Sequence, residues 1–253
     1  MPTQDLYSLI SVLALAVMPS SAWLFFYLRE DTHPEPRYWI LITFTIGVAL
    51  APIVISLEIA LVNFFSKFAG IGGPGSGLLI FFIAPLVEEI AKYGVVHLAL
   101  NKNPVLDEPV DGMIYIIIAA LGFAAIENVF AIFSYIPVGA PGYLSAAFNF
   151  MSMRFISAVA LHGLASGIMG YFFSMYYFIK RDPRFIILGL TLATLLHGLY
   201  NFLIVRTIGE GNPLPAALIG VLLGGAAVLV IYLFNRLKHF KTYQQTIIDE
   251  AAE

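Results

Sequence analysis

Charged residues are scarce in this chain. Only 11% of its 253 residues are Asp, Glu, Lys or Arg, whereas a soluble domain carries roughly 25%. Lys and Arg number 13 against 16 Asp and Glu, so there is no basic excess for binding nucleic acid. Hydrophobic residues make up 60% of the chain. This composition excludes a soluble enzyme, a disordered chain and a nucleic-acid-binding protein, and it predicts an all-α, polytopic membrane protein.

Cysteine is absent altogether. Its absence excludes a disulfide framework, a thiolate nucleophile and a zinc site built on cysteine. Any chemistry must therefore come from carboxylates, histidines and hydroxyl groups.

Long apolar stretches are abundant, and a transmembrane helix needs about 20 largely apolar residues. Dividing the chain at its Pro, Gly and charge clusters predicts a bundle of about seven transmembrane helices. We interpret the chain, 1–253, as a single membrane domain with a short cytoplasmic tail at 237–253. The predicted spans are 6–28, 38–66, 78–100, 111–135, 145–179, 184–206 and 214–236.

The loop charges predict the orientation of the chain in a cell membrane, because cytoplasmic loops carry the excess of Lys and Arg. With the N-terminus outside and the C-terminus in the cytoplasm, the outer loops hold Lys67 and Arg206. The cytoplasmic segments then hold Arg29, Arg37, Lys102, Lys180, Arg181, Arg184, Arg236, Lys238 and Lys241. This unequal division favours an N-terminus outside.

A charged side chain in the hydrocarbon is costly, so each one is a functional candidate. Counting residues along the predicted spans places Glu88, Glu127, His162 and His197 in one layer less than about 10 Å thick, near the bilayer midplane. Four side chains from four helices at one depth suggest a shared site. The same count places Arg154 and Asp111 near an interface, where a charged group reaches water easily.

Each candidate also has a purely structural interpretation. Lys92 is four residues after Glu88 and could only neutralise it, while Glu89 points about 100° away, so we expect that Lys92 cannot fully satisfy both. Asn128 could simply form a hydrogen bond between helices, and a single buried histidine commonly makes only a polar contact in the core. His197 is harder to dismiss, because Asn201 follows one turn later on the same face.

Four ordered motifs resemble one known family. Pro85-Leu-Val-Glu88-Glu89-Ile-Ala-Lys92 is similar to the E-E-x-x-K motif of the PrsW-type intramembrane proteases, relatives of the CAAX prenyl endopeptidases. Phe123-Ala-Ala-Ile-Glu127-Asn128 resembles the second motif of that family. Leu161-His162-Gly163 and His197-Gly-Leu-Tyr-Asn201 resemble its two histidine motifs. The resemblance covers roughly 80–205, within a motif-bearing core of about 78–206.

The resemblance implies an intramembrane endopeptidase that cuts a membrane-anchored, single-span protein. PrsW-type proteins make the first, site-1 cut in an anti-sigma factor on the outer side of the membrane, which starts release of a sigma factor. The implied catalytic residues are Glu88, Glu89, Lys92, Glu127, Asn128, His162, His197 and Asn201. The glutamate pair would act as general base, His197 with Asn201 would hold the oxyanion, and His162 with Glu127 and Asn128 would position the water or the leaving group.

Two alternatives to this mechanism remain open at the level of the sequence. A zinc ion bound by candidates among Glu89, Glu127, His162 and His197 would also activate water. We favour metal-independent glutamate catalysis, because the chain has no H-E-x-x-H motif and the ligands would come from separate helices. A proton-coupled transporter or channel would use the same buried carboxylates and histidines, but the internal repeat expected of such a transporter is not apparent.

Overall fold

The computed structural model describes residues 2–31, 33–68, 77–101, 103–210 and 213–252. Within these ranges helices are the only regular secondary structure. They form seven continuous helices, so the expected all-α bundle is confirmed. Six of them are α1 (Pro2–Leu28), α2 (Arg37–Phe68), α3 (Gly77–Ala99), α4 (Pro109–Tyr135), α7 (Arg184–Glu210) and α8 (Pro213–Ala252). The seventh is composite and runs through α5 (Tyr143–Arg154), the π-helical turn η1 (Phe155–Val159), α6 (Ala160–Ser174) and the π-helical turn η2 (Met175–Lys180).

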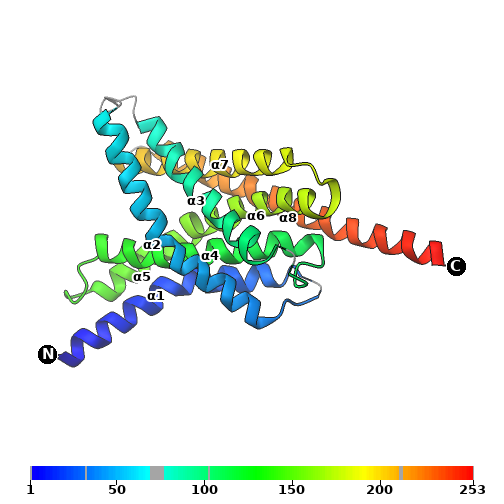
Figure 1. The fold of residues 1–253 in the computed structure, drawn as a ribbon. Coiled ribbons are helices and arrows are strands. Elements are labelled where there is room, and N and C mark those ends of the chain that lie inside the picture. Colours follow the sequence, from blue (N-terminus) through cyan, green and yellow to red (C-terminus); the bar gives the residue numbers. More distant parts are fainter. Residues whose placement is uncertain (1, 32, 69–76, 102, 211–212, 253) are drawn as a thin grey trace.

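Six of the seven helices in the described ranges are long and apolar enough to cross a membrane. The exception is α3, whose 23 residues include Glu88, Glu89 and Lys92. Helix α3 nevertheless lies in the bundle beside α7 and α2 (Figure 1). The predicted span that carries the most charge therefore packs in the bundle with its charged side chains Glu88, Glu89 and Lys92 buried. The chain is a multi-pass membrane protein.

The helices run back and forth between two ends of the bundle, on the left and right of Figure 1. We call the end at which α1 begins the N-side; it also holds the α4–α5 connection, 136–142. The opposite end, the C-side, holds the connections 29–36, 100–108 and 181–183. Helix α8 extends beyond the C-side and continues through 237–252, the stretch interpreted as a tail.

Helix α4 is the centre of the bundle. Every residue from Pro109 to Ala125 is buried, because α1, α2, α3, α6 and α8 all pack around it. Its sequence is apolar on all sides, as expected for a helix that is enclosed on all sides. The position of α4 therefore controls the positions of its neighbours.

Two glycines allow α2 and α4 to approach at backbone distance. A Cβ at Gly122 of α4 would collide with the carbonyl oxygen of Phe44, and a Cβ at Gly47 of α2 would collide with that of Ala119. Small residues permit this kind of close packing between membrane helices. The contact sets the distance between the two helices.

We expect Gly122→Ala to destabilise the bundle, because the new methyl group meets backbone atoms that cannot move aside. The expected loss is about 1–3 kcal/mol, typical of overpacking, measured as a lower Tm of the purified protein. Gly94→Ala on α3 is the matched control, since a Cβ there meets nothing within 4 Å. Equal Tm values for the two variants would contradict the backbone contact.

Candidate active site

Helix α3 places two carboxylates and one ammonium in the interior of the bundle. Lys92 Nζ lies 2.9 Å from Glu88 Oε2 and 2.9 Å from Glu89 Oε1. All three side chains are buried: Glu88 is 5% exposed, Glu89 0% and Lys92 1%. Lys92 reaches both glutamates, because positions three and four residues earlier both lie beneath the long lysine side chain. It contacts one oxygen of each, which agrees with the expectation that it cannot fully satisfy both.

His162 of α6 connects this triad to α4. Its Nδ1 lies 2.9 Å from Lys92 Nζ, and its Nε2 lies 2.7 Å from Glu127 Oε2. Since an ammonium can only donate, Nδ1 accepts and the ring proton is assigned to Nε2, which donates to Glu127. Both ring nitrogens of His162 are therefore engaged.

His197 of α7 approaches the pair from the other side. Its Nδ1 lies 3.1 Å from Glu89 Oε1, and Ser166 donates to Glu89 Oε2 over 3.3 Å. A carboxylate paired with a lysine acts as an acceptor, so Nδ1 of His197 is assigned the proton. Both oxygens of Glu89 are occupied, and His197 keeps its other ring nitrogen for a further partner.

The layer predicted from residue counting is a physical cluster. Glu88 Oε2 lies 3.8 Å from His162 Nδ1 and 3.9 Å from His197 Nδ1. The two histidine rings are perpendicular, with centroids 5.1 Å apart. The convergence of Glu88, Glu127, His162 and His197 is thereby confirmed, although their catalytic roles remain a prediction.

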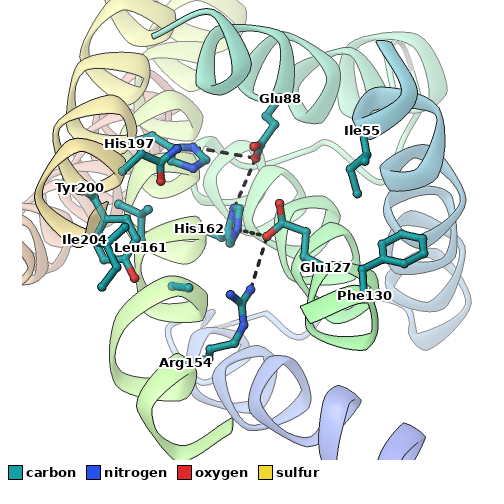
Figure 2. Close-up of a pocket in the computed structure, with 12 residues that line it drawn as sticks. Ile55, Glu88, Glu127, Phe130, Arg154, Leu161, His162, His197, Tyr200 and Ile204 are labelled. Carbon is teal, nitrogen blue, oxygen red and sulfur yellow. Dashed lines mark hydrogen bonds and ion pairs between the residues drawn. The ribbon is translucent and has the colours of Figure 1, made fainter. Parts of the chain in front are cut away.

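A cavity of about 320 Å³ borders this cluster (Figure 2). Its polar lining consists of Glu88, Glu127, Arg154, His162, His197, Tyr200 and Asn201. Glu89 is not among the lining residues, so the two adjacent glutamates differ: Glu88 reaches the cavity and Glu89 lies behind it. Phe130 and Ile204, which also line the cavity, lie farther along α4 and α7 toward the N-side, so the cavity extends to that side.

Arg154 is a site residue that the sequence analysis placed near an interface. In the structure it lines the cavity, with Nη2 3.7 Å from Glu127 Oε2 and Nε donating to Asn128 Oδ1 over 2.6 Å. His162 follows Arg154 by eight residues, so in a regular α-helix the two side chains would point about 80° apart around the helix axis. The intervening π-helical turn η1 rotates the chain less per residue and brings both toward the cavity.

The two asparagines of the predicted site have different surroundings. Asn201 lines the cavity, one turn after His197. Asn128 is fully buried and does not line it; its Nδ2 donates to the backbone oxygen of Ala16 over 2.9 Å, and its Oδ1 accepts from Arg154. Asn128 therefore holds α1 and Arg154 in place.

Four donors of the cluster are close enough to hold a metal ion. Glu88, Glu89, His162 and His197 are all buried and offer ligand atoms within 4.8 Å of one another. However, the Lys92 ammonium already contacts both carboxylates and Nδ1 of His162. A dication at these atoms would displace the ammonium or lie next to it in a medium of low dielectric constant, where repulsion is strong. The donors suit zinc by type, but in this arrangement they do not fit a metal.

Comparisons with known proteins agree with the geometry. A family model described as "PrsW family intramembrane metalloprotease" matches residues 35–234. The chain belongs to the PrsW family. Membership makes it a membrane-embedded peptidase and therefore a hydrolase. The transporter alternative is not favoured.

Curated relatives extend the match over most of the chain. A protein named Protease PrsW from Geobacillus kaustophilus (strain HTA426) is 30% identical over 200 residues, covering 78% of this chain and 81% of the relative. Protease PrsW from Clostridioides difficile (strain 630) is 30% identical over 201 residues, covering 78% and 80%. The Bacillus subtilis (strain 168) Protease PrsW is 26% identical over 199 residues, covering 78% and 84%. No solved structure matches the chain closely enough to count as a relative.

The two asparagines of this PrsW-family chain should respond differently to truncation. Asn128→Ala removes the hydrogen bond to the Ala16 carbonyl oxygen and the one that Arg154 Nε donates, so we expect a loss of about 1–3 kcal/mol in unfolding free energy. Asn201→Ala, at the half-buried cavity wall, should change stability by less than about 0.5 kcal/mol. Thermal unfolding of both purified variants measures the difference, and the reverse order would contradict these contacts.

Proposed function

We propose that this protein is an intramembrane endopeptidase in which Glu88 activates the water that cleaves a membrane-anchored substrate. The observation that carries the proposal is the shared cavity: a carboxylate from α3, one histidine each from α6 and α7, and an amide from α7 border the same space inside a membrane bundle. Peptide hydrolysis needs an activated water, a stabilised oxyanion and a proton for the leaving amine. The residues at this cavity can supply all three.

Glu88 is the general base because, of the two adjacent glutamates, it is the one that borders the cavity. It takes a proton from water as the water oxygen bonds to the scissile carbonyl carbon. It then returns that proton to the amide nitrogen as the C–N bond breaks. Lys92, at 2.9 Å, compensates part of the buried negative charge of the pair and keeps the Glu88 carboxylate in place.

His197 and Asn201 stabilise the oxyanion from one face of α7. Glu89 accepts the hydrogen bond from Nδ1 of His197, which orients the ring and stabilises positive charge on it. With a proton on both ring nitrogens, His197 donates from Nε2, together with the Asn201 amide, to the developing oxyanion. Glu89 is in this interpretation a positioning residue, held by Lys92 and Ser166.

Arg154 and Glu127 form the wall of the cavity toward the N-side and position the substrate backbone. Glu127 lies between His162 and Arg154, 2.7 Å from Nε2 of the former and 3.7 Å from Nη2 of the latter. A guanidinium at this wall can donate to peptide carbonyl oxygens. The substrate would enter from the N-side, where the cavity extends.

The substrate class we propose is a single-span membrane protein of the anti-sigma-factor kind, cut on the outer side of a bacterial membrane. The excess of Lys and Arg on the C-side supports a cytoplasmic C-side and an N-side that faces outward. Since the cavity extends toward the N-side, the substrate would then be cut in the outer half of the membrane.

We expect Glu88→Gln to reduce kcat by about 10²–10⁴-fold, the usual contribution of a general base. The amide keeps the size of the side chain, so the Tm should show that the fold survives. Cleavage of a purified single-span substrate in lipid nanodiscs, followed by mass spectrometry of the products, measures the effect. Asp182→Asn in the connection 181–183 is the matched control and should cleave normally. Full activity of a folded Glu88→Gln protein would refute the assignment.

A zinc-selective chelator should leave cleavage unchanged, because Lys92 takes the place of a metal among the donors. Added zinc should not stimulate the reaction. Initial rates before and after 1,10-phenanthroline, with the non-chelating isomer 1,7-phenanthroline as control, provide the measurement. Loss of activity that zinc restores would establish a metal mechanism and overturn this part of the proposal.

A further inference from the structure

A second group of acidic residues lies at the C-side, separated from the active site along α4. It joins the connection 29–36 to the beginning of α4. Asp31, Glu108 and Asp111 each offer a carboxylate oxygen, and these oxygens lie within 4.8 Å of one another. All three residues are buried, with exposed fractions of 9%, 8% and 1% respectively. The mechanism above uses none of them.

One oxygen of this cluster has no partner. Asp31 Oδ1 accepts from the backbone amide of His33 over 2.8 Å. Asp31 Oδ2 is enclosed and has no hydrogen-bond partner among the described residues. A buried carboxylate oxygen without a donor is costly, and this one belongs to a carboxylate that faces two others. The arrangement points to a missing positive ligand.

Two of the three carboxylates, and a fourth acid beside them, have no basic partner among the described residues. Glu35 is also buried, and its Oε2 accepts from Tyr115 over 2.7 Å. In the described part of the chain, no lysine or arginine pairs with Asp31, Glu35 or Asp111. Burial raises the pKa of the Asp31 carboxyl, and the charge of Glu108 raises this pKa further, against the His33 amide bond. Asp31 and Glu108 thus repel each other.

Asp111 is held in place before any ligand binds. Its Oδ2 accepts from the backbone amides of Asp107 and Glu108, over 3.0 and 2.6 Å. Glu108 in turn lies 3.1 Å from Nδ1 of the exposed His33. Oxygen ligands from short, constrained segments are typical of sites for hard cations, whose ligands on opposite sides lie about 4–5 Å apart.

We propose that Asp31, Glu108 and Asp111 bind a hard divalent cation of the Mg²⁺ and Ca²⁺ class. The ion joins the connection between α1 and α2 to the first turn of α4. It neutralises the three carboxylates and supplies the partner that Asp31 Oδ2 lacks. Its role is to hold the C-side end of the central helix, whereas catalysis takes place at the other cluster.

The test is the thermal stability of the full-length purified protein in detergent, first stripped of metals and then titrated with MgCl₂ or CaCl₂. Wild-type protein should gain on the order of 5 °C in Tm at saturation with at least one of the two ions. Sodium chloride of equal ionic strength should not reproduce the gain. No gain with either ion would overturn the proposal and indicate that protons neutralise the cluster.

Asp31→Asn distinguishes a site from a general salt effect. The variant should lose the cation-dependent gain, while without cation its Tm should equal or exceed that of wild type, since it removes one of the mutually repelling charges. Asp182→Asn, whose carboxylate pairs with Arg184 at the same end of the bundle, should keep the full gain. A gain retained by Asp31→Asn would overturn the assignment. These readouts do not involve cleavage, so they are independent of the proposed function.

Discussion

The structure depends on the burial of Lys92 between two adjacent glutamates. Removing one ammonium and two carboxylates from water costs several kcal/mol per ion, which only close pairing and further hydrogen bonds repay. Lys92 alone leaves a net negative charge and unused acceptors on the pair. The surrounding helices provide the remaining partners: His197 and Ser166 for Glu89, and His162 for Lys92. The convergence of helices at this depth is therefore a requirement of buried charge.

The same geometry makes two chemically identical neighbours unequal. Adjacent positions on a helix point about 100° apart, so only one glutamate of the pair faces the cavity. Glu89 turns inward, where both of its oxygens are occupied, and Glu88 keeps one side toward the cavity. In the proposed mechanism, the doubled glutamate thus separates two tasks: one carboxylate reacts and the other orients a histidine. Neither task requires a second helix to bring a carboxylate.

The sequence predicted those features that follow from the cost of burying charge. The long apolar stretches with few charges predicted the helices. The depths of the buried charged and histidine side chains predicted which of these side chains meet. Arg154 escaped because residue counting gives the depth of a side chain but not its direction, and the π-helical turn after Arg154 changes which side of the helix it faces. The resemblance assigned Asn128 to the site together with Glu127, but in the structure only Glu127 lines the cavity, because adjacent residues on a helix point in different directions. The C-side cluster was missed because Asp31 and Glu108 come from two connections and Asp111 from the first turn of α4, and only the fold brings them together.

Helix α4 connects the two clusters mechanically. Toward the N-side, α4 carries Glu127, which lines the cavity, and Asn128, which bonds to α1. At the C-side its first turn contains Asp111. Between them, Gly122 brings α4 to backbone distance from α2, so the helix cannot slide along α2 without a clash. A closely packed helix transmits displacement because it deforms little. A shift of α4 at its C-side end would therefore move Glu127 relative to His162, and a hydrogen bond of 2.7 Å to a carboxylate tolerates little movement. The geometry of the cavity thus depends on how α4 is held at its far end.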